Sequence, residues 1–84
     1  TVSRASSELD IRGLETLEAE SVVENYLDSA VMAKLGTVTI IHGKGTGALR
    51  KAVHEILKRN KAVKSFRLGR YGEGEAGVTV VELK

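Results

Sequence analysis

The sequence predicts a small α/β domain, a two-layer sandwich with the element order βαβαββ, from three observations. Four short segments have the alternation or the β-branched content of strands. Two longer segments repeat apolar residues at three- and four-residue steps, which is typical of amphipathic helices. With 84 residues, the chain has room for one modest core and one domain.

The elements fill residues 9–84, after a polar, aperiodic stretch at residues 1–8 that we interpret as the end of a linker. We expect strands at residues 9–12, 37–41, 63–68 and 78–83, and helices at residues 16–34 and 48–60. The first strand alternates apolar and polar residues and ends at Gly13. The first helix would have Thr16 as its N-cap and stop at Gly36, before a β-branched run that predicts a buried strand.

The elements in the second half of the domain are predicted from the same kinds of pattern. Apolar side chains from Leu49 to Leu57 share one face of the second helix. In the third strand Phe66 and Leu68 share a face, and a glycine-rich loop at residues 69–77 leads into the last strand. Right-handed crossovers would place both helices on one face of a mixed four-stranded sheet, leave its other face open and make the first two strands parallel.

The charges of the chain are unevenly distributed, although its net charge is only +2. Residues 42–70 carry nine basic side chains and one acidic side chain, a charge of +8. Residues 1–41 carry −4 and residues 71–84 carry −2. Because a concentrated positive field attracts polyanions, this distribution favours DNA or RNA as the partner.

The composition argues against several other classes of protein. Without cysteine, the chain has no disulfides and no thiolate zinc site, which fits a reducing cytoplasm. No apolar run has the length of a membrane span or a signal peptide, so we expect no membrane partner. The two histidines have neither cysteines nor clustered carboxylates beside them, so we predict no metal site.

The strongest motif is a glycine-rich turn between the second strand and the second helix. Gly43, Gly45 and Gly47 occupy alternate positions, so backbone N–H groups can approach an anion closely. The turn leads into a helix N-terminus, and Lys44 and Thr46 add a charge and a hydroxyl. The motif predicts a phosphate cradle, and a tight turn without a ligand is an equally weighted alternative. Its spacing matches neither a Walker P-loop nor a dinucleotide-binding fingerprint.

Three side chains are expected beside this cradle, at the carboxyl ends of the first two strands. Because an imidazole can gain or release a proton near neutral pH, His42 would serve as a general acid or base. Arg12 would clamp a phosphate, with Asp10 orienting Arg12 or a water. The alternatives are a structural histidine and an ordinary surface arginine.

The second helix carries a basic stripe. Arg50, His54 and Lys58 recur at four-residue steps, and Lys51 lies beside them. We expect this stripe to face solvent and follow a phosphate backbone; the alternative is an ordinary solvated face. Only Tyr71 is placed to stack on a base, so recognition of backbone and shape is favoured over base stacking.

Together these motifs resemble the Smr (small MutS-related) domain, over nearly the whole chain. The matching segments are Leu9–Gly13 (LDIRG), Ile41–Arg50 (IHGKGTGALR) and Gly77–Leu83 (GVTVVEL). The pattern looks most like the domain at the C-terminus of bacterial MutS-two proteins, and a chain beginning at Thr1 fits a piece of a longer protein. Many Smr domains have histidine where this chain has Arg12, and the MutS-two branch often carries arginine there.

The resemblance implies a fold similar to the C-terminal domain of bacterial translation initiation factor three, with the last strand antiparallel between the second and third. It also implies a sequence-independent endonuclease that nicks DNA, or in relatives cleaves RNA. We expect no cofactor in this domain, and the sequence leaves open whether a divalent metal is required. The parent family carries an ATPase domain and is linked to recombination control and to rescue of collided ribosomes.

Two function hypotheses follow. In the first, the domain is an endonuclease in which His42 moves a proton, Arg12 and Lys44 hold the phosphate, and the glycines supply the cradle. In the second, it is a binding module that docks the parent ATPase on branched DNA or ribosomal RNA without cutting. A nucleotide-binding fragment is a weaker third hypothesis, which titration with ATP or NAD would test.

Overall fold

Every strand and helix expected from the sequence is present in the computed structural model, which describes residues 7–45, 47–70, 72 and 75–84. The elements are β1 (Glu8–Asp10), α1 (Thr16–Met32), β2 (Thr37–Ile41), α2 (Ala48–Arg59), β3 (Val63–Leu68), a short 3₁₀ turn η1 (Glu75–Gly77) and β4 (Val78–Leu83). The order βαβαββ is thereby confirmed.

The four strands form one mixed sheet in the order β1-β2-β4-β3. β1 pairs with β2 in parallel, and β4 pairs antiparallel with both β2 and β3. The last strand therefore lies between the second and third, as the resemblance implies. Parallel pairing brings the ends of β1 and β2 to the same edge of the sheet, where Asp10 is level with Ile41.

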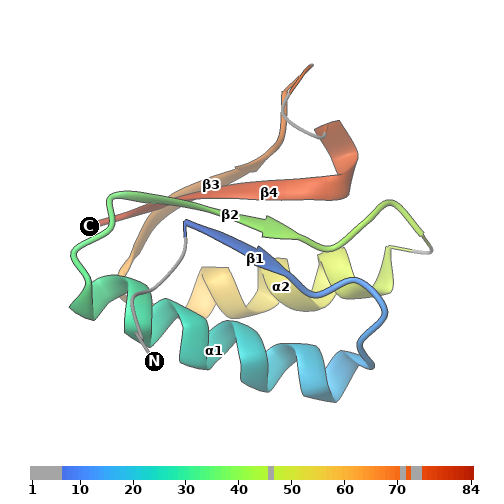
Figure 1. Cartoon of the computed structure of the whole chain (residues 1–84), viewed down its shortest axis with the longest axis horizontal. Helices are drawn as coiled ribbons and strands as arrows, with labels where there is room; N and C mark the ends of the chain where they lie inside the picture. The colour runs from blue at the N-terminus through green and yellow to red at the C-terminus, as the bar shows by residue number, and fades with distance from the viewer. Residues whose placement is uncertain (1–6, 46, 71, 73–74) are drawn as a thin grey trace.

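Both helices cover the same face of the sheet, as Figure 1 shows. Their apolar faces and the inner face of the sheet enclose the core. Its buried side chains are Ile11, Ala19, Val23, Leu27, Ala30, Val38, Ile40, Val53, Ile56, Leu57, Val81 and Leu83. No described helix covers the opposite face of the sheet, which confirms the two-layer arrangement.

The ends of α1 differ from the expectation. Thr16 is not the N-cap: Glu15 takes that position, without a side-chain hydrogen bond to the helix end. The helix ends at Met32, and the chain leaves the helical path at Lys34, before Gly36, because Lys34 adopts a left-handed conformation with φ 60°. The N–H of Lys34 donates to the carbonyl of Val31 (3.0 Å), and that of Leu35 donates to the carbonyl of Ala30 (3.0 Å). These two bonds form a Schellman motif with lysine at the usual glycine position.

The first strand is also displaced by about one residue. β1 begins at Glu8, inside the expected linker, and ends at Asp10. Ile11 leaves the strand but still donates its N–H to the carbonyl of Ile41 (2.9 Å), and its side chain is fully buried. Arg12 therefore lies on the turn that follows β1. The rest of the expected linker, residues 1–6, is outside the described residues.

Candidate functional site

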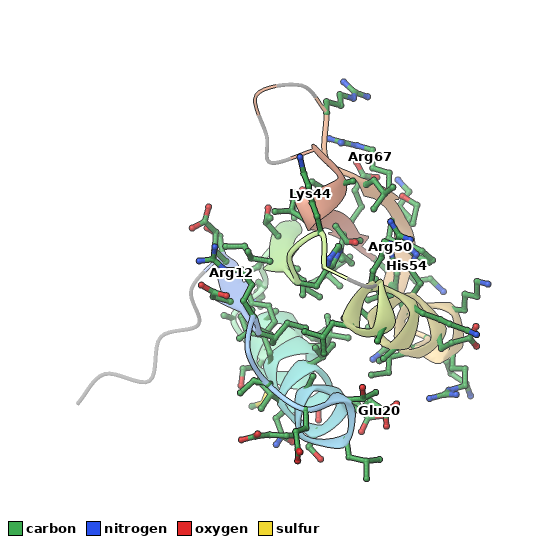
Figure 2. The ribbon with its side chains drawn as sticks, turned by 90° about the vertical axis from the view of Figure 1, so that its right-hand side faces the viewer. Arg12, Glu20, Lys44, Arg50, His54 and Arg67 are labelled. Carbon is green, nitrogen blue, oxygen red and sulfur yellow. The ribbon has the colours of Figure 1, made fainter. Side chains whose placement is uncertain are left out.

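An open cleft of about 680 Å³ lies at the sheet edge where β1 and β2 end. The turn after β1 forms one wall, and the glycine-rich loop with the first turn of α2 forms the other. Its lining residues are Arg12, Gly13, Leu14, Glu15, Thr16, His42, Gly43, Gly45, Gly47, Ala48, Leu49 and Arg50. Figure 2 shows Arg12 and Arg50 on opposite sides of this region, with Lys44 above them. Arg12 and the glycine loop therefore line the same cleft.

Asp10 holds Arg12 through two parallel hydrogen bonds. The Nε of Arg12 donates to Oδ1 of Asp10 (3.0 Å), and its Nη2 donates to Oδ2 (2.7 Å). The backbone N–H of Arg12 adds a third bond to Oδ1 (3.0 Å). These bonds lower the pKa of Asp10 to about 2 and raise that of Arg12, so both stay charged at neutral pH. The Arg12 side chain is still 62% exposed, so a ligand in the cleft can reach it.

The glycine loop packs tightly against its neighbours. Gly43 has a φ of +80°, and a Cβ there would lie 3.4 Å from Cγ of Arg12. Its N–H donates to the carbonyl of Gly77 (2.8 Å), beside the bond from the His42 N–H to the same oxygen (3.1 Å). The N–H of Gly43 is therefore engaged within the protein, which corrects its expected place among the donors of the phosphate cradle. Thr46 lies outside the described residues.

The N-terminus of α2 opens onto the cleft. Gly47 is its N-cap with a φ of 87°, and no side chain of the described residues caps the helix end. N–H groups of a first turn project from the helix end and carry partial positive charge. The Arg50 guanidinium folds back over this turn. Its Nη2 lies so close to Gly47 that a Cβ added there would be 3.1 Å away. An anion at this point would meet both the helix end and Arg50.

The ring of His42 is turned into the protein. His42 is only 4% exposed. Its Nδ1 lies 2.9 Å from the carbonyl oxygen of Gly43, and its Nε2 lies 2.8 Å from Oγ1 of Thr79. Both ring nitrogens are therefore occupied by protein groups. A general acid or base needs a ring nitrogen that can reach the substrate, whereas here the loop carbonyl and the threonine hydroxyl already engage both nitrogens of His42.

His54 also turns toward the sheet, so its predicted place in a solvent-facing stripe is wrong. Its Nε2 lies 2.9 Å from the same Oγ1 of Thr79, and its ring packs on Phe66 at a centroid distance of 5.0 Å. Burial lowers the pKa of His54, and the nearby positive charges and His42 lower it further. The remaining stripe divides, because Arg50 lines the cleft while Lys51 and Lys58 are exposed.

Thr79 is the site residue that sequence reasoning missed. It lies fully buried on β4, which otherwise carries mostly apolar side chains. The only signal in the sequence is a hydroxyl within a valine-rich strand. Its partners are 37 and 25 residues away in the chain, so no local motif could indicate them.

The part of the chain that the structure describes has neither a cluster of candidate metal ligands nor a helix that could span a membrane. It contains no group of three or more His, Cys, Asp or Glu side chains that could hold a metal ion. Separately, neither helix has the length and apolarity needed to cross a membrane.

Comparison with known proteins identifies relatives of the whole domain. Endonuclease MutS2 of Ruminiclostridium cellulolyticum is 62% identical over 79 residues, and that of Clostridium beijerinckii is 59% identical over 83 residues. These alignments cover 94% and 99% of this chain but only 10% and 11% of the relatives. The chain thus spans about a tenth of the length of these curated relatives.

Solved structures agree with the sequence relationship. The Smr domain of Thermus thermophilus MutS2 superposes with a TM-score of 0.89 at 49% identity, covering 92% of this chain and 96% of that one. YdaL, a stand-alone small MutS-related protein from Escherichia coli, has the same fold, with a TM-score of 0.88 at 24% identity over 99% of this chain and 66% of that one. The Smr domain family model matches residues 9–84. The chain therefore belongs to the Smr domain family.

Proposed function

We propose that this domain binds the phosphate backbone of nucleic acid in the cleft and cuts it there, as an endonuclease module of a larger MutS2-like protein. One observation carries the proposal: Arg12, oriented by Asp10, faces the glycine loop and the N-terminus of α2 across the cleft. The names of the MutS2 relatives supply the reaction class. DNA, duplex or branched, is the proposed substrate, with structured or ribosomal RNA as the alternative.

The proposed roles follow from the positions of the side chains. Arg12 and Arg50 would bind non-bridging phosphate oxygens from opposite walls, and Lys44 would add a third charge from the loop. Gly45 and Gly47 would let the backbone approach the phosphate. His42 has two proposed roles: it holds the loop through Gly43, and it exchanges a proton with the substrate only if its bond to Thr79 opens.

A binding module without cleavage is the second candidate function. It is favoured by the burial of His42, whose two ring nitrogens are both engaged. Such a module would dock the parent ATPase on branched DNA or on the ribosome. Arg12, Lys44 and Arg50 would keep the same binding role in both candidates.

Nicking of supercoiled plasmid separates the two candidates. The purified domain, Arg12→Ala, His42→Ala and the surface control Glu24→Gln are compared with magnesium and with a chelator. If the domain is an endonuclease, the wild type and the control should convert the supercoiled plasmid to open circles. Arg12→Ala would slow nicking by roughly a hundredfold, the scale for loss of one preorganised charge at a reacting phosphate. DNA binding by wild type with no nicking in any condition would favour the binding module, and structured RNA would be tested next.

A further inference from the structure

One threonine hydroxyl joins the two histidines behind the cleft. Thr79 and His42 are the two buried polar side chains in the described part of the chain. Oγ1 of Thr79 lies within hydrogen-bond distance of Nε2 in both His42 (2.8 Å) and His54 (2.9 Å). The ring centroids are 6.2 Å apart and the rings are nearly perpendicular, so the hydroxyl bridges two rings that also meet edge to face.

The hydrogen bonds have a single consistent direction when both histidines are neutral. The carbonyl of Gly43 can only accept, so Nδ1 of His42 carries the proton and its Nε2 is an acceptor. Thr79 has one hydroxyl hydrogen and must donate it to that Nε2. The Thr79 oxygen then accepts from Nε2–H of His54. The chain of bonds runs from His54 through Thr79 and His42 to the carbonyl of Gly43.

The two ends of this chain of bonds belong to different elements: Gly43 lines the cleft, whereas His54 lies on α2 one turn beyond the residues that line it. Gly43 belongs to the glycine loop, and His54 lies on α2, whose first turn lines the cleft with Arg50. The carbonyl of Gly77, directly before β4, also holds the start of the loop by accepting two N–H groups. The loop and the helix are thus fastened to the same strand by nearby residues.

We infer that Thr79 is a positioning residue, whose hydroxyl fixes the glycine loop relative to the N-terminus of α2 and so sets the geometry of the phosphate site. This inference rests on the proposed function, because it assigns Thr79 to the same site. Packing alone does not require the hydroxyl. Valine has nearly the same shape, suits a strand better and carries no polar group that must be satisfied on burial.

The test compares Thr79→Val, which removes the hydroxyl, with Thr79→Ser, which keeps it. Thr39→Val is the matched control, because it makes the same change on β2, away from the histidine pair. Two properties are measured: the ring N–H signals of the histidines with amide exchange in the loop, by NMR, and affinity for a short duplex DNA, by fluorescence anisotropy. Plasmid nicking is followed in parallel.

In Thr79→Val we expect shifted ring signals of both histidines and faster exchange of the Gly43 amide, which is bonded to the carbonyl of Gly77. The dissociation constant for duplex DNA should rise roughly tenfold, as expected for loss of one or two hydrogen bonds. Thr79→Ser should restore all three properties, and Thr39→Val should resemble the wild type. If Thr79→Val does not fold, Thr79→Ser and Thr79→Ala give the same comparison, since they differ only in the hydroxyl.

Unchanged loop exchange in Thr79→Val would overturn the inference, as would equal weakening by Thr39→Val or failure of Thr79→Ser to restore binding. A wild-type domain that neither binds nor cuts nucleic acid would instead contradict the proposed function. In that case the ring signals and the loop exchange would still decide whether Thr79 positions the loop against α2. The two failures are therefore distinguishable.

Discussion

The start of α2 depends on the backbone conformation of its N-cap, Gly47. Its φ of +87° is unfavourable for any residue with a Cβ, and a Cβ there would crowd Nη2 of Arg50 at 3.1 Å. We expect Gly47→Ala to lower the free energy of unfolding by about 1–2 kcal/mol. Gly45 is the matched control, because a Cβ added there would meet no heavy atom within 4 Å and its φ is not left-handed.

Urea unfolding at neutral pH measures both changes. Gly45→Ala should stay within about 0.5 kcal/mol of the wild type. An equal loss in both variants would contradict the view that backbone conformation, and not space in the loop, requires glycine at Gly47.

His54 makes the stability of the fold depend on pH. Burial lowers its pKa below 6.5 in the folded state, while the unfolded chain titrates at that ordinary value. Just below pH 6.5, His54 therefore binds more protons in the unfolded state than in the folded state. Its titration lowers the free energy of unfolding as the pH falls. The loss begins near pH 6.5, grows until the folded pKa is reached and is constant below it.

Urea midpoints measured across this range for the wild type and His54→Gln check the effect. The wild type should lose stability as the pH falls through 6.5, and the variant should lose less. Titrating groups that do not interact with His54 contribute equally to both proteins, so the difference between the two curves reports His54 together with the groups coupled to it. Parallel curves would show that His54 does not titrate differently in the folded and unfolded states.

At the scale of elements, α1 and α2 show what the periodic pattern could predict. The apolar repeats locate both helices to within two residues, because burial of one face depends on the spacing along the chain. The helix ends were less predictable, since Glu15 and Lys34 owe their roles to local backbone geometry. The inward turn of His54 was not predictable at all, because its partner Thr79 belongs to a distant strand.

The same α1 offers an internal comparison of buried and exposed apolar residues. Leu27 is fully buried in the core, whereas Met32 at the end of the helix is 83% exposed. We expect Leu27→Ala to cost about 2–5 kcal/mol of unfolding free energy, from lost burial and the cavity left behind. Met32→Ala should change it by less than about 0.5 kcal/mol. Similar urea midpoints for the two variants would contradict this placement of the core.

At the scale of the whole molecule, folding separates part of the charge that the sequence groups. Glu20 of α1 lies beside Lys51 and Arg59 of α2, where all three line one groove, but it lies apart from the basic residues near the glycine loop. Figure 2 shows Glu20 at one end of the view and Lys44 and Arg67 at the other. A polyanion would therefore be attracted to the cleft side and repelled from α1, so the charge distribution orients the domain before any close approach.

This orientation predicts how the salt dependence of binding responds to single substitutions. Removing one charge that neutralises a phosphate should reduce the slope of log K against log salt by about 0.9 on duplex DNA. Arg50→Gln removes a charge in the cleft and should reduce the slope by that amount, whereas Glu24→Gln on α1 should leave it unchanged. Anisotropy titrations over a series of salt concentrations measure both. A slope unchanged by Arg50→Gln would contradict the phosphate-binding role of Arg50, because release of counterions depends on which charges meet the backbone and not on net charge.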